Sequence, residues 1–205
     1  MLLDILTYPN PELLKLSKSV EKFDKTLHTL LDNMAETMYH ANGIGLAAPQ
    51  VGHKLRVFVI DIAIEEGAEK QLYEFINPTI SCGSGSITFE EGCLSVPGFS
   101  EEVKRKEKIQ IDFQDRFGKP QTLLAEGLLA VAIQHENDHL DGILFIDRLS
   151  EENRKAAMKE IRESEWFGLA SASGQEPIIK ISPHNTFGRG RSEEHTSELQ
   201  SHHDL

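Results

Sequence analysis

The chain has 205 residues, of which 39% are hydrophobic and 26% charged; it is long enough for one globular domain with a tail, and its composition excludes a disordered protein. Its formal net charge of -12 excludes a general nucleic-acid binder, which would present a basic face. No apolar run approaches the roughly 20 residues of a membrane-spanning helix, so no membrane partner is expected.

The N-terminal segment and the cysteines favour the cytoplasm. Residues 1–15 lack a basic region followed by a long apolar stretch, so we expect no signal peptide. The two cysteines, Cys82 and Cys93, are too few for a disulfide framework in a chain of this length. In a reducing compartment a cysteine is usually an inert small hydrophobe, but it can also be a thiolate ligand.

Two helices are predicted first along the chain. Asn10 before Pro11 predicts the start of a short helix over 10–20. Apolar residues at helical spacing over 25–41 predict an amphipathic helix that packs on the core and ends near Asn42-Gly43.

Strands are predicted next. Segments 55–63 and 72–80 are rich in β-branched and aromatic residues, as strands are. Residues 85–98 are predicted to be a strand that runs into a loop punctuated by glycine and proline. The alternation over 108–120 predicts a strand whose hairpin partner is 121–127.

Two further helices complete the domain. Residues 127–142 are largely apolar and predict a buried helix, and residues 150–164 predict a polar surface helix. The strands precede the long buried helix without βαβ alternation. This order predicts an α+β fold: mainly antiparallel sheets packed around a central helix, with N-terminal helices and a C-terminal surface helix.

The C-terminal part lies outside this pattern. We expect a catalytic domain over 1–165 and a loose tail over 166–190, which is rich in Gly, Ser and Pro. Residues 191–205 are interpreted as a non-native extension, because their first eleven residues, RSEEHTSELQS, resemble a translated sequencing adapter. The histidines of this extension are therefore not considered as metal ligands.

The buried helix carries a candidate metal site in the stretch QHENDHLDG, residues 134–142. His135 and His139 are four residues apart, so both can reach one metal ion from the same helix face. Glu136 lies about 60–100° around the helix from them, which suits a general base beside the metal. A chance pattern, or a hydrogen-bonded polar cluster without metal, is the alternative.

A catalytic metal needs three protein ligands and one open position, so a third ligand must come from elsewhere. The candidates are His28, His40, His53 and Cys93. Cys93 lies at a junction of strand and loop with glycine before and proline after, where a tight turn can bring one side chain close to a site. Cys82 is assigned no role.

The loop over 43–52, GIGLAAPQVG, is a second candidate element. Gly43 and Gly45 would let the backbone approach a ligand closely, and Gln50 offers an uncharged amide donor of the kind that holds an oxyanion. A glycine-rich loop that merely caps the early helix is the alternative. A phosphate-binding loop is excluded because no Gly-Lys-Ser/Thr follows.

Taken together, three segments resemble the peptide deformylase family. They are Gly43–Gln50, Glu91–Ser95 and Gln134–His139, which stand in the family's order and match its motifs without departure. The resemblance covers roughly residues 3–163. It implies a metal-dependent hydrolase that removes the N-formyl group from the N-terminal formyl-methionine of newly synthesised polypeptides and releases formate.

The resemblance also implies a role for each motif residue. Cys93, His135 and His139 would bind one divalent metal ion, typically Fe²⁺ in this family, with Zn²⁺, Ni²⁺ or Co²⁺ as alternatives. Glu136 would move the proton, and the Gln50 side chain and the Leu94 backbone N–H would hold the oxyanion.

The substrate would lie across the same segments. Ile44, Val131 and Ala132 would line an apolar pocket for the methionine side chain. Gly45, Glu91 and Gly92 would line the peptide backbone, with Gly43 allowing the same close approach. The partners would be formyl-methionyl nascent peptides; a transient ribosome contact through the helix over 150–164 is left open.

Two rival functions remain. A zinc metallopeptidase would take a third His or Glu downstream of the helix, where His184 lies in the expected tail and Glu151 and Glu152 are explained by a helix start. A catalytically inactive binding domain of the same fold would have lost the base, a ligand or the oxyanion donor, and this chain retains all of them.

Overall fold

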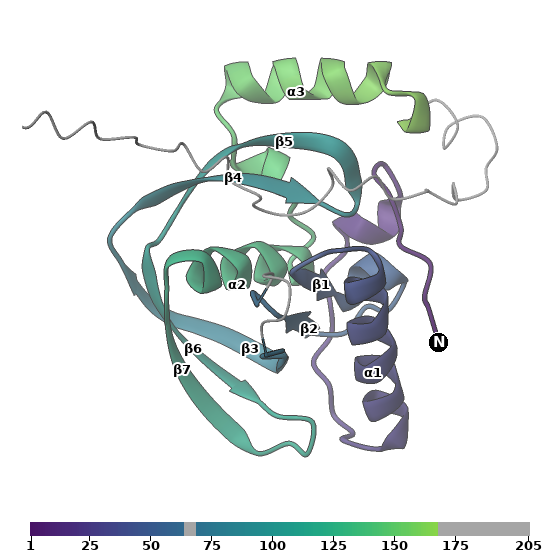
Figure 1. Cartoon of the computed structure of the whole chain (residues 1–205), viewed down its shortest axis with the longest axis vertical. Coiled ribbons are helices and arrows are strands. Elements are labelled where there is room, and N and C mark those ends of the chain that lie inside the picture. The colour runs from purple at the N-terminus through teal and green to yellow at the C-terminus, as the bar shows by residue number, and fades with distance from the viewer. Residues whose placement is uncertain (64–68, 168–205) are drawn as a thin grey trace, which may run out of the picture.

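The computed structural model describes residues 1–63 and 69–167. In chain order its elements are η1 (Pro11–Leu14), α1 (Lys25–His40), β1 (Gly45–Ala47), η2 (Ala48–Val51), β2 (Val57–Ile60), β3 (Tyr73–Ser84), β4 (Ile87–Cys93), β5 (Val96–Arg105), β6 (Lys108–Gln114), β7 (Pro120–Glu126), α2 (Gly127–Leu140), η3 (Phe145–Arg148) and α3 (Glu151–Glu163). Figure 1 shows α2 between the β4–β5 ribbon on one side and β3, β6 and β7 on the other.

The strands form two antiparallel sheets. One sheet has five strands in the order β1-β2-β3-β6-β7, and the other consists of β4 and β5. The β6–β7 hairpin has the predicted pairing, and Gly118 in its turn has a φ of +82°. These sheets confirm the prediction of an α+β fold with mainly antiparallel strands.

Helix α1 forms where the sequence predicts it. The Asp24 side chain caps its start by accepting hydrogen bonds from the backbone N–H groups of Thr26 and Leu27. Its buried face consists mainly of apolar side chains that pack with β1 and β2, including the fully buried Leu31, Met34 and Met38. The prediction of an amphipathic helix that packs on the core is confirmed.

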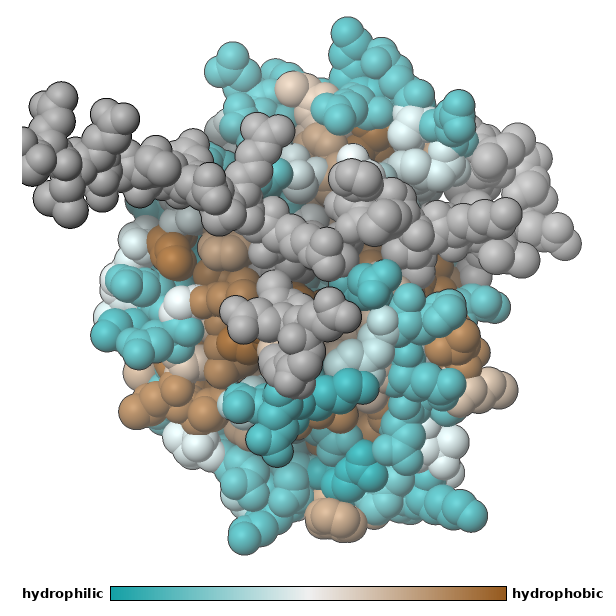
Figure 2. Space-filling model, in the orientation of Figure 1, coloured by the Kyte–Doolittle hydropathy of each residue, from teal (hydrophilic) through white to brown (hydrophobic). Residues whose placement is uncertain are grey.

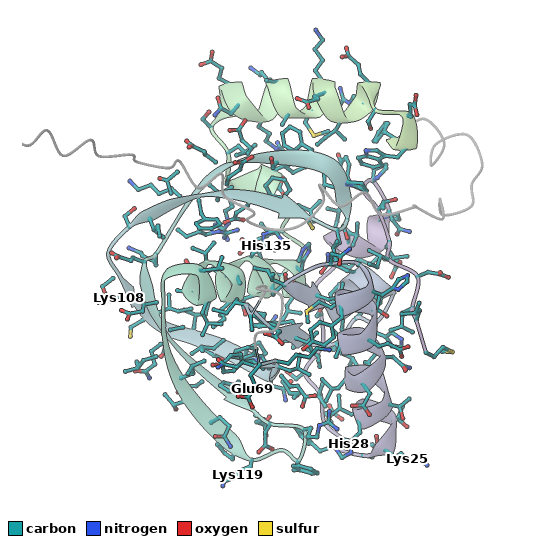
Figure 3. All side chains as sticks on the ribbon, in the orientation of Figure 1. Lys25, His28, Glu69, Lys108, Lys119 and His135 are labelled. Carbon is teal, nitrogen blue, oxygen red and sulfur yellow. The ribbon has the colours of Figure 1, made fainter. Side chains whose placement is uncertain are left out.

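Helix α2 is buried along most of its length. Gly127 has a φ of +60°, which allows the chain to turn directly from β7 into the helix. Residues 130–133 pack with side chains of the five-stranded sheet, such as Phe75 and Ile111. On the opposite side, His135 lies between α2 and the β4–β5 sheet, as Figure 3 shows.

Two strands were not predicted, and one helix is shorter than expected. Strand β5 has buried Phe99, Val103 and Arg105, but its many charged residues obscure this alternation in the sequence. Strand β1 lies in the segment interpreted as a loop, and it is a strand because it pairs with β2. The helix predicted over 10–20 is limited to the four residues of η1.

The C-terminal helix α3 also agrees with its prediction. The Ser150 side chain accepts a hydrogen bond from the Asn153 N–H, and Ala157 and Ile161 are buried against β5 and η3. Figure 2 shows mostly hydrophilic residues along its outer side, at the top of the view. Trp166 and Phe167 pack on the same cluster, so the packed chain extends two residues beyond the expected boundary at 165.

The remaining residues of the predicted tail and extension, from 168 on, lie outside the described part of the chain. Within 1–63 and 69–167, no helix combines the length and apolar character needed to cross a bilayer.

Candidate metal centre

The side chains of Cys93, His135 and His139 converge at one buried point. One potential ligand atom from each lies within 4.8 Å of the others. Cys93 Sγ is 3.3 Å from His139 Nε2, close to the roughly 3.5 Å that separates two ligands of a tetrahedral ion at bond lengths of about 2.0–2.3 Å. All three residues are at most 5% exposed.

Local structure explains this convergence. The two histidines are one helical turn apart on α2, with their ring centroids 5.1 Å apart. Cys93 ends β4, and the pairing register with β5 shifts between Gly92 and Cys93. This irregularity at the strand end presents the sulfur to α2.

The donors fit a divalent transition-metal ion. A thiolate and two imidazoles form a ligand set that suits zinc or iron. Burial opposes protonation of His135, yet hydrogen bonds to Cys93 and Glu91 raise its pKa well above the usual value. The surroundings of the His135 ring therefore favour a positive charge. Burial and the nearby charges of His135 and Arg105 lower the pKa of His139, which keeps its imidazole neutral, as a ligand must be.

Glu91 holds His135 from behind. Its Oε2 lies 2.9 Å from His135 Nδ1, and both its oxygens accept hydrogen bonds from Arg105 at 2.7 and 2.9 Å. Burial opposes ionisation, but the hydrogen bonds from Arg105 and His135 lower the pKa of Glu91 to about 2. Its side chain is 0% exposed and, as an inward-facing residue of β4, meets Arg105 rather than solvent, so the expected contact of Glu91 with a substrate would be made by its backbone and stays a prediction.

The amide of Gln50 is fixed with its NH₂ group toward the cluster. Gln50 is 2% exposed, and its Oε1 accepts a hydrogen bond from the Ala47 backbone N–H at 2.8 Å. Its Nε2 donates to Ser95 Oγ at 3.2 Å and faces Cys93 Sγ at 3.5 Å. The donor therefore points to where a reacting group beside the sulfur would lie.

Glu136 reaches the same space from α2. It is 5% exposed, and its Oε2 has no hydrogen-bond partner among residues 1–63 and 69–167. Burial raises the pKa of Glu136 to about 7. A carboxyl group with this pKa can both accept and donate a proton near neutral pH.

A small hollow of about 10 Å³ joins these groups, with room for about one water molecule. Its lining residues are Gly43, Ile44, Gly45, Gln50, Gly92, Cys93, Leu94, His135 and Glu136. Val131 and Ala132, expected in the methionine pocket, do not line it; they are at most 2% exposed and lie in the core cluster that also contains Ile44.

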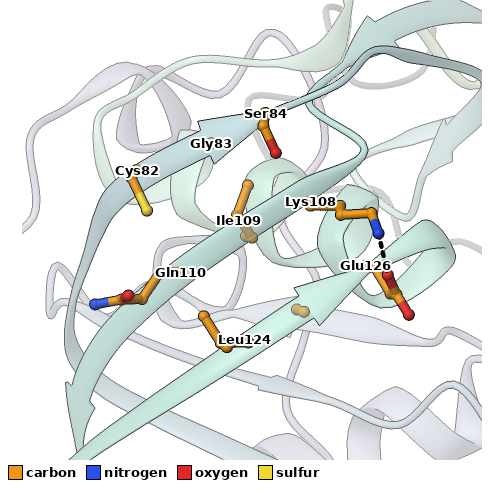
Figure 4. Close-up of a pocket in the computed structure, with 9 residues that line it drawn as sticks. Cys82, Gly83, Ser84, Lys108, Ile109, Gln110, Leu124 and Glu126 are labelled. Atoms are coloured by element: carbon orange, nitrogen blue, oxygen red, sulfur yellow. Dashed lines mark ion pairs between the residues drawn. The ribbon is translucent and has the colours of Figure 1, made fainter.

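The other histidines and the second cysteine lie elsewhere. His28 Nε2 contacts the Arg116 backbone oxygen at 2.7 Å, and His40 and His53 are exposed. Cys82 is exposed beside a hollow of about 480 Å³ on β3, β6 and β7 (Figure 4), where Lys108 pairs with Glu126 at 3.0 Å. In the part of the chain that the structure describes, Cys93 is thus the only candidate third ligand that joins the two histidines.

Sequence reasoning missed the side chains that support the centre. Arg105 and Asp138 are buried and ion-paired at 2.6 Å, and Ser95 is 0% exposed beside Gln50. The alternation of β5 would have placed Arg105 inside, had the strand been recognised. Asp138 belongs to the helix motif itself, but nothing in the motif says which residue it contacts.

Gly45 touches Glu136 so closely that no side chain fits between them. A Cβ at this position would overlap Glu136 Oε1 and lie 2.8 Å from its Cδ. Gly45→Ala should therefore displace the carboxylate and lower kcat by about 100-fold, the cost of a shift of about 1 Å in a reacting group. Steady-state kinetics on the formylated peptide that the resemblance implies as substrate would measure this.

The matched control is Gly45→Ala in a Glu136→Gln background. There the substitution should have a much smaller effect, because the carboxylate that it would displace is already absent. An equal loss in both backgrounds would contradict this explanation, as would a metal content altered by Gly45→Ala alone.

Comparisons with known proteins agree with this geometry. A family model described as Polypeptide deformylase matches residues 2–155. The chain is 52% identical over 160 residues to a peptide deformylase of Nautilia profundicola (77% of this chain, 92% of the relative), and 52% identical over 164 residues to one of Helicobacter acinonychis (79% and 94%). A crystal structure of a peptide deformylase from Legionella pneumophila superposes with a TM-score of 0.74 at 42% identity, covering 86% of this chain and all of that one.

Proposed function

We infer the roles of individual residues from the premise that this chain belongs to the polypeptide deformylase family. It is a metal-dependent hydrolase that removes the N-formyl group from the N-terminal formyl-methionine of newly synthesised polypeptides and releases formate. The observation that carries the assignment of roles is the convergence of Cys93, His135 and His139 beside Glu136 and Gln50.

We assign Cys93, His135 and His139 as the three protein ligands of one divalent ion. When bound, the ion supplies Lewis acidity, which makes water more acidic and polarises a carbonyl oxygen. The neutral imidazole of His139 and the buried sulfur of Cys93 beside it support this assignment. Glu91 supports it from behind by accepting a hydrogen bond from His135, which leaves Nε2 of that ring for the ion.

Glu136 is assigned as the general base and acid. Its carboxylate takes a proton from the water molecule whose oxygen forms a bond to the formyl carbon. The proton then goes to the peptide nitrogen as the carbon–nitrogen bond breaks, so the products are formate and a free α-amino group. The pKa near 7 and the unpartnered Oε2 support this role.

Gln50 and Leu94 are assigned as donors to the oxyanion of the tetrahedral intermediate. The Gln50 Nε2 is held in place before substrate arrives, since its amide is bonded at both ends. Leu94 follows Cys93 directly and is a lining residue of the same hollow, which supports the same role for its backbone N–H. Donors fixed in advance stabilise developing charge without the cost of reorganising.

The substrate is proposed to lie over the glycine-rich lining of the hollow. Gly43, Gly45 and Gly92 allow a peptide backbone to approach the reacting groups. The methionine side chain would be received by Ile44, which packs in one cluster with Val131 and Ala132. Because the latter two are buried, this pocket requires side chains to move apart when substrate binds.

The physiological ion is proposed to be Fe²⁺, with Zn²⁺, Ni²⁺ and Co²⁺ able to occupy the same ligands. The full chain, loaded anaerobically with each ion in turn, should release formate from a formyl-methionyl tripeptide and leave the peptide bonds intact. Fe²⁺ should support the highest kcat/KM, and exposure to air should reduce its rate.

The same assay separates the rival functions. Cleavage of peptide bonds without formate would indicate a zinc metallopeptidase. Absence of hydrolysis with every ion would indicate an inactive binding domain. An acetyl-methionyl tripeptide is the control, and it should not be hydrolysed because its extra methyl group would need space that the hollow lacks.

The cellular setting is also a proposal. Two unpaired cysteines, one of them a proposed ligand, fit a reducing cytoplasm. Nascent chains are the macromolecular substrate, and the polar outer face of α3 is a candidate surface for transient ribosome contact. We further propose that residues 1–165, with Trp166 and Phe167 packed on them, form the catalytic domain, which contains the whole family match over 2–155. From residue 168 on, the expected tail over 166–190 and the extension over 191–205 lie outside the described residues.

A further inference from the structure

Ion-paired side chains form a continuous network from the protein surface to His135. Arg148 donates to Asp138 through Nε at 3.0 Å and Nη2 at 2.6 Å. Asp138 also accepts from Arg105 Nη1 at 2.6 Å. Arg105 donates to Glu91, and Glu91 in turn lies 2.9 Å from His135 Nδ1.

We propose that Asp138 and Arg148 are positioning residues that fix the imidazole ring of His135 toward the ion. The proposal rests on the ligand role of His135 given above. Neither residue lines the hollow where the reaction occurs. They act through the orientation of Arg105 and Glu91.

The geometry of Arg105 explains why a distant partner matters. Its Nε and Nη2 hold the two oxygens of Glu91, while its Nη1 is held by Asp138. A planar guanidinium bonded along both edges cannot pivot. Without Asp138, the group could rotate about its bonds to Glu91, and the acceptor that orients His135 would move with it.

The exposure of the ion-paired side chains increases from Glu91 at the inner end to Arg148 at the outer end. The side chain of Glu91 is 0% exposed, those of Arg105 and Asp138 are 5% and 8% exposed, and that of Arg148 is 45% exposed. Charges in a buried region must stay paired, so the inner members depend on one another. Arg148 borders a hollow of about 580 Å³, which gives water access to Asp138 when Arg148 is replaced.

Element η3 contacts His135 by a second route. Phe145, at the start of η3, stacks on the His135 ring with centroids 6.0 Å apart. Arg148 is the last residue of the same short helix. Its bonds to Asp138, which lies on α2, therefore also anchor the element that packs against the ligand ring.

An effect of net charge on the ion and an effect on the orientation of His135 predict opposite results for one variant. The four ion-paired side chains, Arg148, Asp138, Arg105 and Glu91, are two bases and two acids, so their charges sum to zero. Asp138→Asn leaves one extra positive charge near the ion and should weaken ion binding under either explanation. Arg148→Met leaves one extra negative charge, which would strengthen binding if charge alone acted, but it loosens Asp138 and should weaken binding if positioning acts.

The test uses the full chain loaded with Co²⁺ and measures ion release to a chelator together with the visible absorption of the ion. Arg148→Met should release Co²⁺ about fivefold faster. Asp138→Asn should release it more than about tenfold faster, in the 10–100-fold range by which loss of a residue that orients a ligand typically weakens metal affinity. The absorption bands should shift in both variants, kcat should fall, and KM should stay nearly constant. Arg148→Lys should restore part of the effect.

The matched control is Arg154→Met, which removes a partner of Asp147 at 2.9 Å at the same junction of η3 and α3. It should leave ion release and the Co²⁺ spectrum unchanged. Release or spectra of Arg148→Met that match this control, or slower release, would overturn the proposal. If Asp138→Asn does not fold, Arg148→Met decides alone; a wild-type chain that binds no ion at all would instead overturn the assigned ligand role.

Discussion

Replacing Glu136 with glutamine is expected to lower kcat by about 1,000-fold while the bound metal and the fold are retained. General acid–base catalysis contributes about 10²–10⁴-fold, and here one carboxylate would serve both proton transfers. Glutamine has nearly the same size, so it can fill the space beside Gly45, but it cannot take a proton from water. Formate release measures the loss, and elemental analysis measures the metal.

A control for this substitution is Glu151→Gln on the exposed surface of α3, where the carboxylate pairs with Lys155. It should leave kcat unchanged because it lies outside the hollow. Activity of Glu136→Gln close to that of the wild type would refute the assigned base. A loss of activity accompanied by loss of the metal would mean that Glu136 supports the centre rather than the proton transfer.

Replacing Cys93 with alanine is expected to weaken metal binding by at least about 100-fold. Removal of a residue that only orients a ligand already costs about 10–100-fold, and loss of the ligand itself should cost more. Two imidazoles would remain, too few for a stable catalytic site. Elemental analysis after gel filtration would show less than one ion per chain, and formate release would fall in proportion.

Cys82→Ala provides the matched control, because Cys82 is exposed and does not belong to the cluster of Cys93 and the two histidines. Its metal content and rate should equal those of the wild type. An unchanged metal content in Cys93→Ala would show that the third ligand is another residue, and the assignment of the centre would need revision.

The helices could be predicted because their signals are local. The capping side chains Asp24 and Ser150 stand directly before α1 and α3, and the spacing of apolar residues shows which face is buried. The motif of α2 likewise places His135, Glu136 and His139 within one turn of each other, since helical geometry alone decides this.

The unpredicted strands depend on neighbours distant in the sequence. Gly45–Ala47 is a strand because β2 pairs with it, and nothing within those three residues requires this. In strand β5 the charged residues Glu101, Glu102 and Lys104 stand between buried ones. Only the pairing of β5 with β4 decides which of its side chains face inward. Strand preference is decided largely by such pairing and packing.

The candidate site divides in the same way. The sequence by itself determined the α+β class, the helices and the chemistry of the motif residues, because residue type and short spacing act through local geometry. Only the tertiary structure decided that Cys93 joins the histidines while His28, His40 and His53 do not, and that the Glu91 side chain faces Arg105 rather than solvent. These contacts join residues about 40 or more positions apart or on different strands, and they arise from the shared burial of α2 between two sheets, which no local pattern encodes.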